Sequence, residues 1–243
     1  MPKSPRRLAH PNPRGFEAVD TLVFDLDNTL YPSHCNLFAQ VDRNMGAYVA
    51  KLLGIPPAEA KRVQKQYYWE HGTTLAGLMS RHQVDPEHFL AAVHDIDYSP
   101  VEPAPELVAA LAALSKRKIV FTNGSRRHAE QVLARLGLAG TFDGIFDITD
   151  ADYIPKPREE TYRRFVDAHA VVGDRSAMFE DLPQNLVSAH GLGMTTVLIH
   201  SDVGDHPVYG DISSWTELPE HVHHHTDDLA GFLRRLAATS SGS

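Results

Sequence analysis

The chain has 243 residues, of which 42% are hydrophobic, which is enough for one large domain or for a core domain with a smaller one. Its formal net charge of −8 argues against a nucleic-acid-binding surface, and its single cysteine, Cys35, fits a reducing compartment. No apolar run reaches the roughly 18 residues that a membrane helix needs, and we find no secretory signal. We therefore expect a cytoplasmic protein that binds neither nucleic acid nor a membrane, and no protein partner is indicated.

Residues 1–15, rich in proline and arginine, are expected to form a disordered tail. The apolar run from Leu22 to Phe24 is typical of a buried parallel strand, and it leads directly into Asp25 and Asp27. Two carboxylates so close together repel each other, and they persist where a cation or a shared proton relieves the repulsion. We expect the two aspartates to have different roles.

Residues 33–100 show helical periodicity without a strand candidate. Four helices are predicted there, over 36–53, 57–70, 73–82 and 85–94. Because this block lies between the first and the second predicted strand, we interpret residues 33–100 as an all-helical cap. The cap is inserted into an α/β core of residues 16–32 and 101–243.

From residue 105 onward, helices and strands alternate. Helices are predicted over 105–115, 125–136, 158–169, 183–190 and 227–236, and strands over 118–122, 144–149, 177–179 and 195–199. Such alternation implies parallel βαβ units, so the expected fold class is a doubly wound, Rossmann-like parallel sheet. Residues 201–220 are expected to form a loop and 239–243 a flexible end, and the histidines within 221–225 are interpreted as part of an exposed loop.

Four short motifs stand where predicted strands end. They are Asp25-Leu-Asp27-Asn-Thr, Thr122-Asn123-Gly124-Ser125, Lys156-Pro157 and Glu180-Asp181-Leu-Pro-Gln-Asn185. Open α/β sheets bind ligands at the carboxyl ends of their strands, so we expect the motifs to meet in one crevice.

Each motif supplies a different group for phosphoryl transfer. Asp25 offers a carboxylate nucleophile and Asp27 a second carboxyl group for proton transfer. Thr122 offers a hydroxyl group, and the Asn123-Gly124 turn offers backbone N–H groups at a helix start, where anions bind well. Lys156 offers a cation that offsets the charge on the transferring group. Glu180 and Asp181 are then candidate oxygen ligands for Mg²⁺.

In these motifs and their order, residues 19–200 resemble the haloacid dehalogenase superfamily, whose members are mostly phosphatases with an aspartate nucleophile. The resemblance implies that Asp25 becomes an aspartyl-phosphate. It implies that Asp27 is the general acid and base, and that its backbone carbonyl binds Mg²⁺.

The same resemblance assigns roles to the remaining motifs. Thr122 and Lys156 are implied to hold the phosphate, with Asn185 as a further candidate substrate-binding residue, and Asp25 and Asp181 are implied to ligate Mg²⁺. Glu180 is either a direct ligand or a neighbour that tunes Asp181, and Asn185 orients Lys156 or Asp181.

The position of the helical block and further sequence matches narrow the resemblance to one family within the superfamily. The 95 positions from Asp27 to Thr122 hold the helical block, whereas only 34 separate Thr122 from Lys156. Two segments are similar in sequence to the pyrimidine 5′-nucleotidase family: the motif Asp-Leu-Asp-Asn-Thr-Leu-Tyr-Pro and the cap segment 67–78. That family implies nucleoside monophosphates such as UMP and CMP as substrates, with Tyr68 and His71 of the cap segment as candidate binding residues.

Three other functions are weighed against this one. A phosphatase of another small metabolite, such as a sugar phosphate, shares the same phosphate machinery. A metal-independent dehalogenase needs no acid at Asp27 and no Glu180-Asp181 pair, so these residues disfavour it. A catalytically idle binding module is disfavoured by the complete set of motifs.

Overall fold

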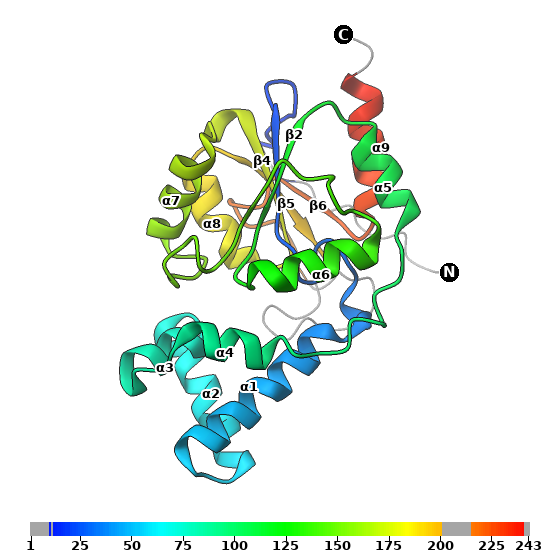
Figure 1. Ribbon diagram of the computed structural model, residues 1–243. Helices are drawn as coiled ribbons and strands as arrows, with labels where there is room; N and C mark the ends of the chain where they lie inside the picture. The colour runs from blue at the N-terminus through cyan, green and yellow to red at the C-terminus, as the bar shows by residue number, and fades with distance from the viewer. Residues whose placement is uncertain (1–9, 11, 201–214, 241–243) are drawn as a thin grey trace, which may run out of the picture.

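In this computed structural model, residues 10, 12–200 and 215–240 are described, and they contain a parallel six-stranded sheet with helices on both faces (Figure 1). The strands follow the order β3-β2-β1-β4-β5-β6 across the sheet. They are β1 (Thr21–Phe24), β2 (Arg117–Phe121), β3 (Gly144–Phe146), β4 (Ser176–Glu180), β5 (Thr195–Ile199) and β6 (His224–Thr226). Every pairing is parallel, which confirms the predicted fold class.

Alternate side chains of the central strand β1 build two separate cores. Leu22 and Phe24 face a core shared with α5 (Pro105–Ala112), α6 (Arg126–Leu136) and α9 (Leu229–Ser240). Val23 faces a core shared with α7 (Glu159–His169) and α8 (Pro183–Gly191). The sheet is therefore covered on both faces, and this explains why its strands are apolar on both sides.

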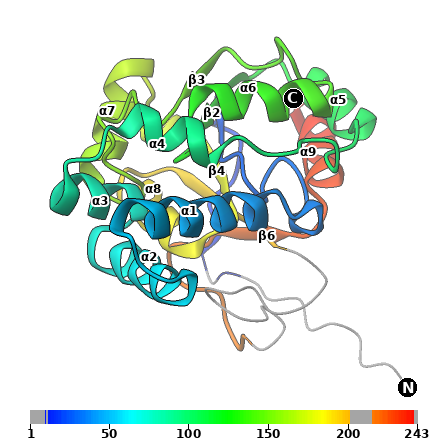
Figure 2. The same ribbon diagram turned by 60° about the horizontal axis from the view of Figure 1, so that its bottom comes forward.

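The first four α-helices that follow β1 in the chain form a unit at one end of the sheet (Figures 1 and 2). They are α1 (Leu37–Leu53), α2 (Pro57–His71), α3 (Thr74–His82) and α4 (Pro86–Val93). Their limits follow from local signals: Gly54 adopts a left-handed conformation after α1, and the Thr73 hydroxyl accepts the Ala76 N–H at the start of α3.

This helical unit has its own core, which reaches the sheet domain through one segment. Val49, Leu78 and Phe89 are buried together, and Ile148 from the loop after β3 packs among them. The Tyr153 hydroxyl donates to Glu87 of α4 at 2.6 Å. The helices are thus seated on the loop that leads to Lys156.

Two strands differ from the prediction: β3 ends at Phe146 instead of Thr149, and β6 was not predicted. The histidines within 221–225 are not in an exposed loop, because strand β6 pairs with β5 and places Val197 opposite His224. The His223 side chain is buried, and its Nδ1 accepts the Thr196 N–H at 3.1 Å. A three-residue strand at the edge of the sheet, built of polar residues, has no apolar alternation by which it could be recognised.

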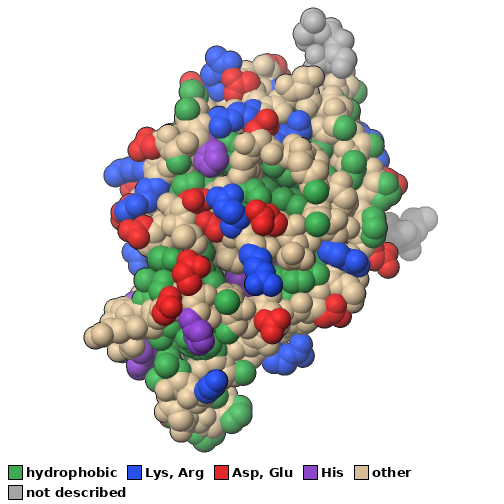
Figure 3. All heavy atoms as spheres, in the orientation of Figure 1, with side chains coloured by type: hydrophobic (Ala, Val, Ile, Leu, Met, Phe, Trp, Pro, Cys, Tyr) green, Lys and Arg blue, Asp and Glu red, His purple; other side chains and the backbone are tan. Residues whose placement is uncertain are grey.

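Other predictions fall partly outside the described residues, namely the tail at 1–9 and 11, the loop at 201–214 and the end at 241–243. In the described part of the tail, the Gly15 carbonyl accepts the Thr195 hydroxyl and Arg14 donates to the Gly193 carbonyl. None of the described helices is long and apolar enough to span a membrane. Basic and acidic side chains are interspersed over the face shown in Figure 3.

Candidate active site

The four motifs meet at the carboxyl ends of the central strands. Strands β1 and β4 are neighbours, and the chain leaves them toward opposite sides of the sheet, which is where open α/β sheets bind ligands. The Asp25 N–H donates to the Phe179 carbonyl at 2.9 Å, so the backbone after β1 stays attached to β4. This hydrogen bond brings Asp25 beside Glu180 and Asp181.

Lys156 lies buried at the centre of the site. Its Nζ donates to Asp25 Oδ1 at 2.6 Å, to Glu180 Oε1 at 2.9 Å and to the Phe121 carbonyl at 2.8 Å. Burial by itself would lower the pKa of the ammonium group, but the two carboxylates outweigh it and raise the pKa above its ordinary value. Lys156 is therefore a fixed cation directed at the candidate nucleophile.

The loop carrying Lys156 is held by the motif after β2. The Asn123 amide accepts the Lys156 N–H at 2.8 Å and donates to the Lys156 carbonyl at 3.2 Å. The Asn123 side chain therefore holds Lys156, a contact that the sequence did not predict, since the expectation for this turn concerned its backbone N–H groups. Thr122 is buried, and its Oγ1 accepts the Gly124 N–H at 2.9 Å, which closes the turn at the start of α6.

Asp27 lies apart from Lys156 and has different partners. Its Oδ1 accepts the Tyr31 hydroxyl at 2.5 Å and the His128 Nε2–H at 2.8 Å. Burial raises the pKa of Asp27, but the charge and hydrogen bond of His128 and the Tyr31 hydroxyl lower it to about 2. The two aspartates thus differ in environment, because both follow the end of β1 at Phe24, where the regular alternation of a strand no longer applies.

Burial and the neighbouring Glu180 raise the pKa of Asp25 to about 7 despite the opposing effect of Lys156. Burial and the charges of Glu180 and Asp25 raise the pKa of Asp181 well above its ordinary value. Such repulsion between buried carboxylates is the environment that a divalent cation relieves.

Asp25, Glu180 and Asp181 form a buried acidic cluster whose oxygen atoms lie within 4.8 Å of one another. Hard oxygen donors of this kind fit Mg²⁺ or a similar cation. The three are not equivalent, however. Glu180 Oε1 accepts from Lys156 and from the Asn185 amide, and Oε2 accepts the Leu182 N–H at 3.0 Å.

The hydrogen bonds of Glu180 show that it fixes Lys156, which leaves Asp25 and Asp181 better suited to hold the ion. Asn185 is buried and donates to Glu180 Oε1 at 2.5 Å. Its contact with Lys156 or Asp181, expected from the resemblance, is therefore indirect. Asn28, which the sequence did not single out, donates to Asp181 Oδ2 at 3.3 Å.

The two cap residues predicted to bind substrate have different surroundings. Burial raises the pKa of the Tyr68 hydroxyl, which hydrogen-bonds the Gln184 side chain and senses the charge of Asp181. Tyr68 therefore stands at the edge of the acidic cluster. His71 instead lies between Glu70 and Arg81, whose Nε donates to its ring at 3.3 Å.

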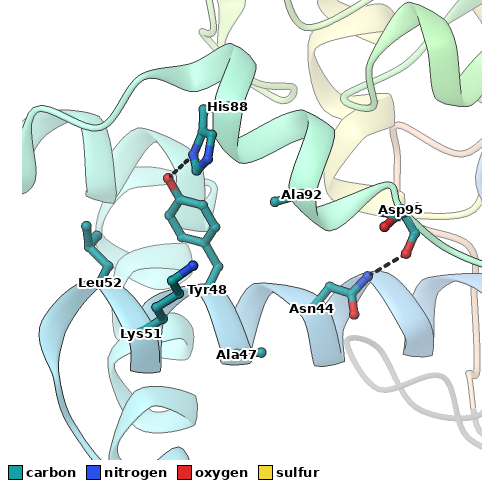
Figure 4. Close-up of a pocket in the computed structure, with 8 residues that line it drawn as sticks. All are labelled: Asn44, Ala47, Tyr48, Lys51, Leu52, His88, Ala92 and Asp95. Atoms are coloured by element: carbon teal, nitrogen blue, oxygen red, sulfur yellow. Dashed lines mark hydrogen bonds between the residues drawn. The ribbon is translucent and has the colours of Figure 1, made fainter.

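His71 also lines a hollow of about 450 Å³ where the cap meets the loop before Lys156. A larger hollow, of about 620 Å³, lies on the cap between α1 and α4 (Figure 4). Tyr48 and His88 close one end of it with a 3.0 Å hydrogen bond, and Asn44 donates to the Asp95 carbonyl at the other. None of the predicted site residues lines this larger hollow, so volume alone does not locate the chemistry.

Sequence reasoning missed His128, Tyr31 and Asn28. His128 is brought to Asp27 by the fold, since 101 positions separate the two residues, whereas Tyr31 follows Asp27 by only four positions. The one local signal for His128 is its place in the first turn of α6, three residues after Ser125, whose hydroxyl accepts its N–H at 3.3 Å. This position does not by itself identify a site residue, since Arg126 in the same turn pairs with Asp150.

Comparison with known proteins agrees with this geometry. The pattern of a family described as haloacid dehalogenase-like hydrolase matches residues 19–193. The chain is 28% identical over 212 residues to Phosphate metabolism protein 8 of Saccharomyces cerevisiae. This match covers 80% of the chain, which spans 64% of the length of that relative.

Solved structures share the fold at low identity. A HAD phosphatase from Thermococcus onnurineus has a TM-score of 0.57 and 16% identity, covering 93% of this chain and 99% of that chain. The L-2-haloacid dehalogenase from Xanthobacter autotrophicus has a TM-score of 0.55 and 16% identity, covering 92% and 99%. The same fold therefore carries two chemistries, and the site residues must distinguish them.

Proposed function

The chain belongs to the haloacid dehalogenase-like hydrolases, and we propose that it is a Mg²⁺-dependent phosphatase of small phosphomonoesters. The observation that carries this proposal is the buried Lys156 at 2.6 Å from Asp25, with Asp181 in the same acidic cluster. A cation beside a buried carboxylate suits the attack of that carboxylate on an anionic group, because it offsets the charge of two anions that meet.

In the proposed reaction, an Asp25 oxygen attacks phosphorus, and the bond between phosphorus and the leaving oxygen breaks. The Thr122 hydroxyl and the N–H groups of the turn at Gly124 bind the phosphate oxygens. A bound Mg²⁺ would be held by Asp25, Asp181 and the Asp27 carbonyl, and would supply positive charge beside the phosphate. Lys156 offsets the remaining charge.

Asp27 transfers the protons in both steps. It is ionised in the resting site, and the approach of a phosphate dianion disfavours its charge, so it takes up a proton as substrate binds. That proton passes to the leaving oxygen. Asp27 then accepts a proton from the water that attacks the aspartyl-phosphate, and phosphate and free Asp25 are regenerated.

We further infer that the substrates are nucleoside 5′-monophosphates, with UMP and CMP preferred. The motif wording supports this, and the name of the yeast relative supports a role in phosphate metabolism. Tyr68 stands beside Asp181, and the ring of Trp69, 75% exposed, lies 5.4 Å from that of Tyr68. Aromatic faces at the edge of a phosphate site suit the stacking of a base.

The experiment measures phosphate release from UMP, CMP, AMP, GMP and ribose 5-phosphate, with Mg²⁺ or with EDTA. Asp25→Asn is the test variant. Asp20→Asn is its matched control, because Asp20 is an exposed carboxylate just before the same strand, paired with Arg175 at 2.5 Å. We expect turnover that EDTA and Asp25→Asn abolish and Asp20→Asn leaves intact, fastest with UMP and CMP.

Two outcomes would contradict parts of the proposal. Metal-dependent turnover without pyrimidine preference would retain the phosphatase and reject the substrate assignment. Chelator-resistant release of halide from a 2-haloacid, with no phosphate release, would indicate the dehalogenase chemistry, which Asp27 and Asp181 disfavour.

A further inference from the structure

A group of side chains lies behind Asp27 that the proposed reaction does not use. His128 donates from Nε2 to Asp27 Oδ1 at 2.8 Å, and Tyr31 donates to the same oxygen. The other oxygen, Oδ2, lies 3.7 Å from the position that a Cβ on Gly124 would take. One oxygen of Asp27 is therefore held from behind, while the other faces the phosphate-binding turn.

His128 is itself held by the segment that returns from the cap to the sheet. Its side chain is 1% exposed, and its ring stacks on that of His94 with centroids 4.5 Å apart and an interplanar angle of 16°. Its Nδ1 lies 3.0 Å from the Tyr98 hydroxyl, while His94 Nδ1 lies 3.0 Å from the Ser125 hydroxyl. Both ring nitrogens and one ring face of His128 thus have fixed partners.

We propose that His128 is a positioning residue for the acid–base carboxylate. It holds Asp27 Oδ1 so that Oδ2 stays directed at the leaving oxygen of the substrate. His94 follows α4 directly and Tyr98 precedes α5, so a shift of the cap moves the surface on which the imidazole rests. The seating of the cap and the direction of Asp27 are linked in this way. The inference rests on the proposed acid–base role of Asp27.

Two substrates with different leaving groups distinguish a positioning role of His128 from a purely structural one. The oxygen that leaves UMP needs a proton, whereas p-nitrophenolate leaves p-nitrophenyl phosphate as a stable anion. If Asp27 is no longer directed at the leaving oxygen, hydrolysis of UMP therefore slows more than hydrolysis of p-nitrophenyl phosphate. The quantity compared is kcat/KM, because it reports the steps up to departure of the leaving group and excludes hydrolysis of the aspartyl-phosphate.

His128→Leu removes the donor, and His128→Gln retains an N–H near the position of Nε2. We expect His128→Leu to lower kcat/KM for UMP about 10- to 100-fold, within the range for lost proton transfer, and for p-nitrophenyl phosphate less than about threefold. His128→Gln should recover most of the kcat/KM for UMP that His128→Leu loses. Tyr98→Phe, which removes one hydroxyl group, should lower the ratio of kcat/KM for UMP to kcat/KM for p-nitrophenyl phosphate by a few-fold.

Asp27→Asn separates failure of this inference from failure of the proposed function. If Asp27→Asn slows both substrates equally, the acid role of Asp27 is wrong. If Asp27→Asn discriminates but His128→Leu and Tyr98→Phe slow both substrates equally, the positioning role is wrong. Should His128→Leu fail to fold, His128→Gln and Tyr98→Phe still give the ratio. If the wild type does not hydrolyse UMP, ribose 5-phosphate takes its place.

Discussion

The Nζ atom of Lys156 lies 2.6 Å from Oδ1 of Asp25, although 131 positions separate the two residues in the chain. The same ammonium group donates to Glu180, so one buried cation balances two buried carboxylates. Removal of one partner from such a group leaves an uncompensated charge in the interior.

Lys156→Met is therefore expected to lower the free energy of unfolding by about 3–5 kcal/mol as well as to abolish activity. Urea denaturation at neutral pH measures it. Addition of Glu180→Gln to that variant should recover part of the loss, because one of the unpaired charges is then gone. Lys65→Met, at an exposed position of α2, should change stability by less than about 0.5 kcal/mol. A stable Lys156→Met would mean that the buried charges are not coupled.

Asn123 is expected to act on catalysis through Lys156, because both atoms of its amide bind the Lys156 backbone. Asn123→Ala should lower kcat/KM by up to about 100-fold, since a small displacement of the ammonium weakens its contact with the phosphate. Asn123→Asp keeps the acceptor for the Lys156 N–H and should lose less. Steady-state kinetics checks both variants, and an Asn123→Ala variant with wild-type kcat/KM would contradict this role of Asn123.

Much of the sheet and the cap was predictable from the sequence, because β1 and its neighbours are continuous apolar runs and α1 ends at Gly54. The candidate nucleophile Asp25 and the acidic pair Glu180-Asp181 follow from strand ends that the topology places together, and Lys156 joins them from the loop after β3. The sequence predicts these strands and site residues because each motif consists of residues close together in the chain.

The partners of those groups could not be predicted in the same way. His128 meets Asp27 only once α6 packs on the sheet, and Asn123 reaches the Lys156 backbone across 33 positions. Strand β6 is too short and too polar to show a period. Long-range hydrogen bonds between polar side chains leave no spacing in a single sequence.

The contact between α2 and α3 in the cap makes one glycine irreplaceable. A Cβ on Gly77 would lie 2.5 Å from the Tyr67 Cβ, so Gly77→Ala must push the two helices apart. We expect a loss of about 1–3 kcal/mol in the free energy of unfolding. Gly191→Ala in α8 meets no atom within 4 Å and should be neutral or stabilising by up to about 1 kcal/mol. Equal melting temperatures for the two variants would contradict this packing.

His223 makes stability depend on pH. Burial, together with the nearby His190, His10, Arg14 and His224, lowers its pKa from 6.5 to about 4. The folded state resists protonation that the unfolded state accepts, so the stability present above pH 6.5 is lost as the pH falls toward 4. Urea denaturation from pH 7.5 to 4.5 measures this decline.

The variant His223→Asn keeps an acceptor near the position of Nδ1 for the Thr196 N–H but cannot titrate. Its stability should fall less with decreasing pH than that of the wild type. His88→Asn, at an exposed position of the cap, should leave the slope unchanged. A wild-type slope in His223→Asn would place the titrating group elsewhere.

The proposed aspartyl-phosphate on Asp25 is tested by trapping the phosphorylated enzyme. UMP labelled with ³²P is mixed with the protein and Mg²⁺, the reaction is quenched in acid within milliseconds, and the labelled peptide is identified. We predict acid-stable label on the peptide that contains Asp25, present in the Asp20→Asn control and absent from Asp25→Asn. Phosphate release without any labelled protein, or with label on a different residue, would contradict the mechanism.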